Sequence, residues 1–197
     1  MTLPTVSAGE KEIARFLETR FGGRPKFFIH RETPDDTLHI AVAEKLDFPG
    51  VGLTTCATNG ISNYPLYKDG DEYTKTKLEL VGTCLQNQAG DYRELLFYAG
   101  LIVVKQKWFC APGTFLQDAV SRFGNFGDMR HLYFTTPFAQ EGFETSLFTD
   151  RKVSWLTAIP VSTREVEYAR EKSTDALEDL FESSDFAWEN LSRKSLV

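Results

Sequence analysis

The chain has only three cysteines in 197 residues, and no two of them form a C-x-x-C pair. Cys56, Cys84 and Cys110 are widely spaced, and their number is odd. Such a set predicts neither a disulfide framework nor a zinc site. We therefore expect reduced, mostly buried thiols, as is usual in a reducing compartment such as the cytoplasm.

Long apolar runs and basic stripes are also missing. The longest nearly apolar stretch, residues 95–104, is about half of the length that spans a bilayer. The N-terminal stretch MTLPTVSAGEKEIARF shows no secretory signal. The net charge of −6 disfavours nucleic acid, whose phosphates attract basic surfaces, and it favours basic partners. We expect a cytoplasmic protein with no membrane or nucleic-acid partner.

Motifs for nucleotide, serine-hydrolase and metal chemistry are absent as well. The sequence contains no glycine-rich phosphate loop and no G-x-S-x-G elbow. No histidine or carboxylate pattern has the spacing of metal ligands. Asp35 and Asp36 follow Pro34 in a turn-rich stretch, where aspartate is expected for backbone reasons. We predict no catalytic residue, no metal and no cofactor.

Cys56 lies in the stretch GLTTCATNGISNYPL, which could hold either a nucleophile or a structural thiol. A catalytic cysteine needs a cation or a helix N-terminus to lower its pKa, and a base beside it. Cys56 has uncharged neighbours in the sequence, and no hydrolase signature surrounds His30, His39 or His131. We interpret Cys56 as part of the scaffold. The alternative is a small hydrolase that uses Cys56 or Cys110 with His131.

The sequence does contain ample material for a core, with 42% apolar and 13% aromatic residues. Ser7 and Glu10 have capping-box spacing before an amphipathic helix, a long helix is expected from Asp91, and another begins at 162–165. Helices and strands interleave without a βαβ rhythm. The prediction is one α+β domain over residues 1–197, with a mixed or mostly antiparallel central sheet packed by helices. Strands are expected at 26–30, 37–43, 51–55, 75–81, 131–135 and 152–160.

Two turns and one strand carry more specific predictions. Asn59–Gly60 and the stretch Lys68–Asp71 are turn sequences. In the strand at 75–81, Leu78 and Leu80 alternate with polar residues. Because successive side chains of a strand point to opposite faces, we expect both leucines to be buried. Lys75, Lys77 and Glu79 are expected on the exposed face.

Five short motifs follow one another in a fixed order: GISNYPL (60–66), LELV (78–81), WFCAPG (108–113), FTTPF (134–138) and VSWLTAIPV (153–161). Glu165 follows the last of them. Together they resemble the suppressor-of-fused-like domain in its bacterial, single-domain form. The resemblance covers about residues 37–183, and its specificity comes from the order and spacing of motifs that are weak one by one.

The resemblance implies a non-enzymatic binding module. Animal domains of this kind hold a transcription factor, and the bacterial ones are similar to immunity proteins that neutralise a cognate toxin of contact-dependent or polymorphic secretion systems. This chain departs from the pattern at Asn63, where the motif usually has Asp, and it has no second domain between which a peptide could be clamped. A regulatory adaptor without a toxin partner is a further interpretation.

Two stretches are candidate surfaces for a protein partner. The tail from Ser173 to Asn190 carries six acids and no base, and its apolar stripe predicts a docked helix over about 173–190. Such a helix would suit a basic toxin domain, for example a nuclease, although charge runs usually face water. Its candidate residues are Glu178, Asp179 and Glu182, flanked by Asp175 and Asp185. The second surface is a loop whose tyrosines could anchor an interface: Tyr64, Tyr67, Asp69, Asp71, Glu72 and Tyr73.

Overall fold

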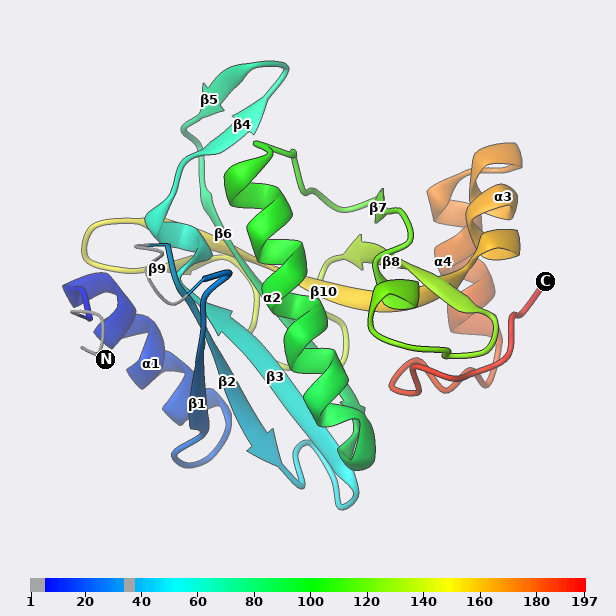
Figure 1. Ribbon diagram of the computed structural model, residues 1–197, viewed down its shortest axis with the longest axis horizontal. Helices are drawn as coiled ribbons and strands as arrows, with labels where there is room; N and C mark the ends of the chain where they lie inside the picture. The colour runs from blue at the N-terminus through cyan, green and yellow to red at the C-terminus, as the bar shows by residue number, and fades with distance from the viewer. Residues whose placement is uncertain (1–5, 34–37) are drawn as a thin grey trace.

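A computed structural model describes residues 6–33 and 38–197 (Figure 1). Its main sheet has eight strands in the order β1-β2-β3-β6-β10-β8-β7, with the short β9 beside the start of β10. Neighbouring strands are antiparallel, except that β6 and β10 are parallel. This confirms the predicted α+β fold. The strands are β1 (Lys26–His30), β2 (Ile40–Leu46), β3 (Leu53–Asn59), β6 (Lys77–Leu85), β7 (Thr114–Leu116), β8 (Met129–Thr135), β9 (Ser146–Leu147) and β10 (Lys152–Ser162).

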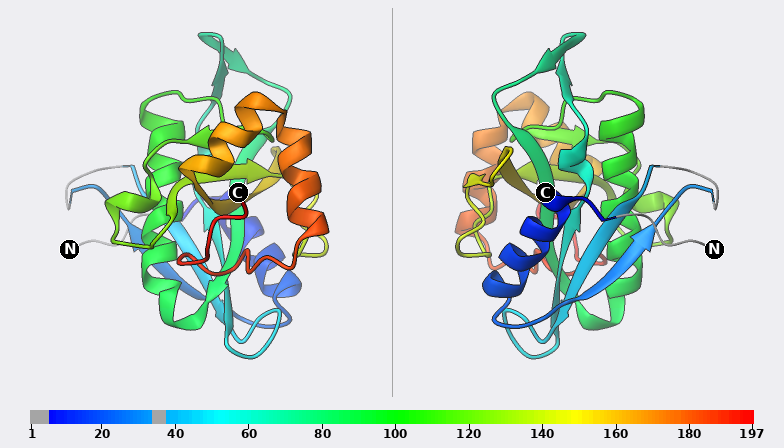
Figure 2. Two further views of the ribbon diagram at one scale, coloured as in Figure 1. Left: turned by 90° about the vertical axis from the view of Figure 1, so that its right-hand side faces the viewer. Right: turned by 90° about the vertical axis from the view of Figure 1, so that its left-hand side faces the viewer.

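Helices cover both faces of this sheet (Figure 2). Helix α2 packs on one face, against β2, β3 and β6, and α1 lies on the other face with the α3–α4 pair farther along it. The long strand β10 shows the division clearly. Leu156 and Ala158 belong to the core under α2, Trp155 to the core under α1, and Ile159 to the core under α3 and α4. The helices are α1 (Ala8–Arg20), α2 (Ala89–Lys105), α3 (Thr163–Glu171) and α4 (Thr174–Ser183).

Local sequence signals account for where the helices begin. The predicted capping box of α1 is present: Ser7 Oγ accepts a hydrogen bond from Glu10 N, and Glu10 Oε2 accepts one from Ser7 N. A second capping box joins Ser162 and Glu165 at the start of α3. Each box satisfies two backbone donors that a helix N-terminus would otherwise leave unpaired.

Several element bounds differ from the prediction; β6, for example, covers Lys77–Leu85 instead of 75–81. Strand β3 ends four residues later than expected, at Asn59, and β2 runs on to Leu46. Helix α4 ends at Ser183, not near residue 190, because Ser184 is already in an extended conformation. The turn expected at Pro34–Asp36, and Thr37 at the predicted start of β2, lie outside the described residues.

The expected exposure of Glu79 is wrong. Leu78 and Leu80 are buried as predicted, at 2% and 0% exposure, but Glu79 is also 0% exposed. Strand β6 lies in the middle of the sheet between β3 and β10, so both of its faces are covered. The alternation of polar and apolar residues therefore marks two different buried environments, and not a core face and a solvent face.

The segment after α4, residues 184–197, returns along the sheet to the start of α2. The Leu85 amide donates to the carbonyl oxygen of Glu189, and Leu191 is buried in the core under α2. We call residues 184–197 the C-terminal segment. Within residues 6–33 and 38–197, no helix has both the length and the apolar character needed to cross a membrane.

Candidate functional site

The first predicted surface is a hairpin that projects from the molecule beyond one end of α2 (Figure 1). Strands β4 (Leu66–Lys68) and β5 (Asp71–Tyr73) pair, and the predicted turn joins them. Asp69 and Gly70 both have positive φ angles, 53° and 92°, which a two-residue hairpin turn of this hand requires. The hairpin carboxylates of Asp69, Asp71 and Glu72 are exposed.

The hairpin tyrosines are less available than its carboxylates. The Tyr73 ring meets the Phe109 ring at 5.4 Å between centroids, and Lys107 Nζ lies 4.3 Å from the centre of the Tyr67 ring. Tyr64 is half-buried at the base of the hairpin. Tyr67 and Tyr73 therefore hold the hairpin on the segment that follows α2, and the acidic tip is the part most open to a partner.

The base of the hairpin is fixed by the buried carboxylate of Glu79. Its Oε1 accepts hydrogen bonds from Gly60 N at 2.9 Å, Ser62 N at 3.0 Å and Ser62 Oγ at 2.7 Å. Its Oε2 accepts one from Thr58 Oγ1 at 2.6 Å. Burial raises the pKa of Glu79 and these bonds lower it, with burial the larger effect. We call residues 58–66 and Glu79 the turn region.

Asn63 has a defined role in the turn region. Its Oδ1 accepts a hydrogen bond from Arg151 Nη1 at 2.8 Å. Arg151 is itself paired with Asp150. Because an amide oxygen accepts this bond as a carboxylate would, the departure from Asp at position 63 keeps the contact and removes one charge.

The second predicted surface contains a groove of about 330 Å³ between α4, the end of β8, Ile159 of β10 and the start of the C-terminal segment. We call it the α4 groove. Its walls are mainly apolar, and Figure 1 shows that α4 and the hairpin lie in different parts of the molecule. The two predicted surfaces are therefore not one site. The groove's aromatic side chains are Phe138, Phe181, Phe186 and Trp188.

Three carboxylates also line the α4 groove: Glu178, Glu182 and Asp185. Glu178 Oε1 accepts hydrogen bonds from Tyr133 Oη at 2.7 Å and Thr135 Oγ1 at 2.6 Å, so this side chain is fixed. Burial, and then the bond to Glu178, raise the pKa of Tyr133. Glu182 and Asp185 are exposed at the rim. The predicted residue Asp179 is exposed on α4 and does not line the groove.

Sequence reasoning missed the aromatic part of this groove. Phe181 and Phe186 stack at 4.5 Å, and Phe138 meets Trp188 edge-on at 5.3 Å. Phe138 keeps 55% of its surface exposed. The sequence signal for this aromatic part was the pair Phe186 and Trp188 in the otherwise polar stretch SSDFAWEN. A uniformly acidic helix would not need these two large apolar side chains.

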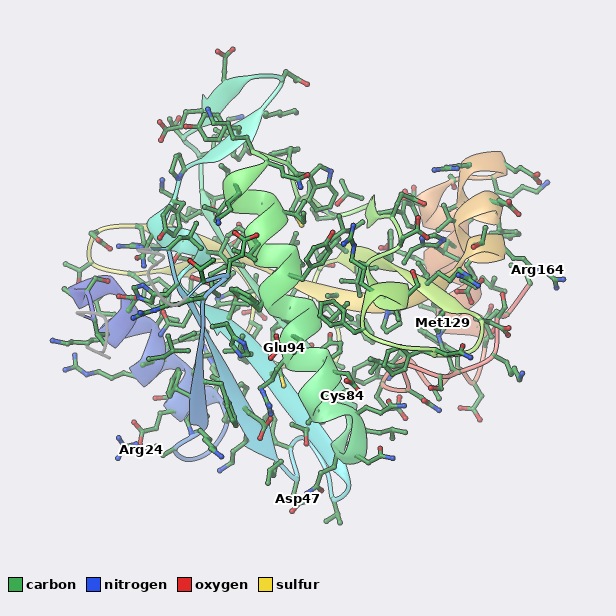
Figure 3. All side chains as sticks on the ribbon, viewed as in Figure 1. Arg24, Asp47, Cys84, Glu94, Met129 and Arg164 are labelled. Atoms are coloured by element: carbon green, nitrogen blue, oxygen red, sulfur yellow. The ribbon has the colours of Figure 1, made fainter. Side chains whose placement is uncertain are left out.

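The cysteines are not arranged as nucleophiles. All three are buried, and Figure 3 shows Cys84 beside α2. A hydrogen bond to Cys84 and then burial raise the pKa of Cys56, and burial raises that of Cys110. Within the described part of the chain, the ring nitrogens of His131 bond to groups other than a cysteine: Nδ1 accepts from Asp118 N at 2.8 Å, and Nε2 lies 3.1 Å from Thr163 Oγ1.

The described residues also contain no group of three or more His, Cys, Asp or Glu side chains that could hold a metal ion.

Comparison with protein families gives a match over most of the chain. Residues 34–194 match the family model described as Suppressor of fused protein (SUFU). A curated protein of Bacillus subtilis (strain 168), named Immunity protein YqcF, is 28% identical over 193 residues. That similarity spans 98% of this chain and 99% of the Bacillus protein.

Solved structures share the fold at low sequence identity. A suppressor of fused homologue from Neisseria gonorrhoeae superposes with a TM-score of 0.73 at 13% identity, over 96% of this chain and 97% of the other. A chain of the Sufu–Fu complex gives 0.70 at 13% identity, over 95% and 92%. Suppressor of Fused from Drosophila gives 0.68 at 12% identity, over 95% of this chain and 51% of the fly protein.

Proposed function

The chain belongs to the suppressor of fused family, and from this premise we propose that it is an immunity protein that neutralises a cognate bacterial toxin by binding it directly. The observation that carries the proposal is the similarity, along nearly the whole of both chains, to a Bacillus protein named an immunity protein. Because the similarity covers 98% of this chain and 99% of the Bacillus protein, it favours a shared mode of action.

The chemistry of the chain supports binding without turnover. A nucleophilic cysteine needs a thiolate, but a hydrogen bond to Cys84 and then burial raise the pKa of Cys56, and burial raises that of Cys110. The imidazole of His131 is engaged with Asp118 and Thr163. We infer a cytoplasmic, non-enzymatic protein whose single domain occupies residues 1–197 and which needs no cofactor, nucleic acid or membrane.

Charge supports a basic toxin domain as the partner, for example a nuclease. The chain has a net charge of −6, and acidic side chains are exposed at the hairpin tip and along α4. Opposite potentials speed the encounter of two proteins and disfavour wrong partners. The proposed contact residues are those of the two surfaces: Tyr64, Tyr67, Asp69, Asp71, Glu72, Tyr73, Glu178, Asp179 and Glu182.

The test is co-expression with a toxin domain encoded beside the gene of this protein. Cells should survive, and survival should be lost once the toxin exceeds this protein, because each copy blocks one toxin. An unrelated toxin is the control and should kill in either case. Protection at a small fraction of the toxin's amount would contradict the proposal and would favour an enzyme, such as the cysteine hydrolase.

A further inference from the structure

The α4 groove has features that the fold itself does not require. It is lined by aromatic rings, one of them Phe138 with 55% of its surface exposed, and by the carboxylates of Glu178, Glu182 and Asp185. No lysine or arginine is among its lining residues in the described part of the chain. An exposed aromatic surface is costly in water, and three carboxylates around it repel one another. A ligand that offsets both costs is cationic and partly apolar.

The groove is fixed in shape before any ligand arrives. Glu178 Oε1 accepts hydrogen bonds from Tyr133 and Thr135, which hold the side chain in place. None of the described hydrogen bonds of Glu178 uses Oε2, so Oε2 remains to accept from a ligand. The ring pair Phe181 and Phe186 is backed by Arg193, whose guanidinium carbon lies 5.7 Å and 5.2 Å from the two ring centres. Fixed walls reduce the entropy lost on binding.

The positive charge of Arg193 does not neutralise the groove. Arg193 forms a buried, two-pronged pair with Glu165, with Nη1–Oε1 at 2.6 Å and Nη2–Oε2 at 2.8 Å. Its Nη2 also donates to the carbonyl oxygen of Pro160 at 2.9 Å. The carboxylates of the groove therefore keep their negative potential, and a cation must come from outside the chain.

We propose that the α4 groove receives an arginine side chain of a protein partner. A guanidinium stacks on aromatic faces and bonds to carboxylates with several donors at once, which suits aromatic walls with acidic groups at the floor and rim. Charge complementarity identifies the occupant: the groove offers carboxylates and aromatic faces, and arginine matches both. The inference rests on the proposed function only in identifying that partner with the toxin.

Binding of the isolated side chain tests the groove without any toxin. The probes are N-acetyl-arginine amide and, as the uncharged isostere, N-acetyl-citrulline amide, titrated against the whole chain and followed by the NMR signals of Trp188 and Phe138. Arginine amide should shift both signals at millimolar concentrations, more weakly with added salt. Equal shifts with citrulline amide, or none with either, would overturn the proposal.

Paired variants connect the groove to the partner. Glu182→Gln with Asp185→Asn removes two exposed carboxylates of the rim, and Trp188→Ala removes a wall. Each should weaken toxin binding, measured by calorimetry, by about tenfold or more. The matched control is Glu167→Gln with Glu171→Gln, which removes the same charge from exposed positions on α3 outside the groove. This control should bind within about twofold of the unaltered chain.

The outcomes separate the two proposals. Equal binding by the rim variant and the control would show that the toxin does not use the groove, and would overturn the inference while the immunity role stands. If the unaltered chain fails to bind the toxin but selects arginine amide over citrulline amide, the immunity role fails and the arginine site is supported. Circular dichroism of each variant confirms that it is folded, which is expected because Glu182 and Asp185 are exposed.

Discussion

The turn region and the C-terminal segment are both organised around a buried glutamate, but the two carboxylates are satisfied differently. Glu79 and Glu165 are each 0% exposed. Glu79 accepts four hydrogen bonds from uncharged donors. Glu165 pairs with the guanidinium of Arg193 and also accepts from the backbone amides of Ser162 and Leu196. The Glu79 carboxyl thus has only uncharged groups bonded to it, whereas the Glu165 carboxyl is paired with a cation.

This difference separates the roles of the two regions. The donors to Glu79 lie 17 to 21 residues before it, so the carboxylate fixes a local turn and the hairpin above it. Arg193 lies 28 residues after Glu165, and it joins the C-terminal segment to α3 and to the rings of the α4 groove. Loss of the second contact should therefore affect a larger part of the molecule, including the proposed arginine site.

The largest effect is expected from Glu165→Ala. It leaves the buried guanidinium of Arg193 without a counter-charge, which typically costs about 3–5 kcal/mol of unfolding free energy. Urea denaturation measures this loss, and Glu167→Ala is the control because Glu167 is exposed two residues away. The control should stay within about 0.5 kcal/mol. A loss below about 1 kcal/mol in Glu165→Ala would mean that the C-terminal segment is held by other contacts.

A smaller loss, about 2–4 kcal/mol, is expected from Glu79→Ala. The substitution strands the buried amides of Gly60 and Ser62 but leaves no buried charge behind. Urea denaturation gives the magnitude, and amide hydrogen exchange locates the effect at residues 60 and 62. Glu79→Gln is the matched variant, since its amide oxygen still accepts, and it should lose less. Equal losses for the two would show that the charge, and not the accepting oxygen, holds the turn.

The pH dependence of stability should distinguish the two carboxylates further. Because burial raises the pKa of Glu79, the folded chain holds this proton more tightly than the unfolded chain. Above the ordinary glutamate pKa of about 4.3, the contribution of Glu79 should therefore fall as pH rises, up to its raised pKa, by at most about 1.4 kcal/mol per pH unit. Urea denaturation at several pH values, for the unaltered chain against Glu79→Gln, isolates this effect. A difference that grows in favour of the unaltered chain with rising pH would contradict it.

Much of this fold could be predicted from local signals. The capping boxes at Ser7 and Ser162, the long apolar helix after Asp91 and the burial of Leu78 and Leu80 all follow from short-range periodicity and turn chemistry. These signals involve residues within a few positions of one another, so the sequence displays them directly.

The groove and the buried carboxylates could not be predicted in the same way. Glu79 alternates with apolar neighbours as an exposed residue would, and only the central place of β6 in the sheet buries it. The wall of the groove joins Phe138 to Trp188, which are brought together by the return of the C-terminal segment. Such contacts depend on the whole topology. The apolar stripe did predict a helix, but not that Glu178 turns inward to Tyr133.

The smallest effects are expected from the cysteines, which lie in the core under α2 and take part in neither carboxylate network. Cys56, Cys84 and Cys110 are 0%, 0% and 3% exposed, so replacing each by Ala removes one buried atom and should cost about 1 kcal/mol. Because Cys56 and Cys84 interact, the double replacement should differ from the sum of the two single ones. Toxin neutralisation should be unchanged in all of them.

Alkylation of the cysteines in the folded chain should be slow. A hydrogen bond to Cys84 and then burial raise the pKa of Cys56, and burial raises that of Cys110, so little thiolate exists at neutral pH. Mass spectrometry after timed exposure to iodoacetamide measures this, with the urea-unfolded chain as the fast reference. Rapid alkylation of one cysteine in the folded chain, together with loss of protection in its Ala variant, would contradict the scaffold role and return the cysteine hydrolase to first place.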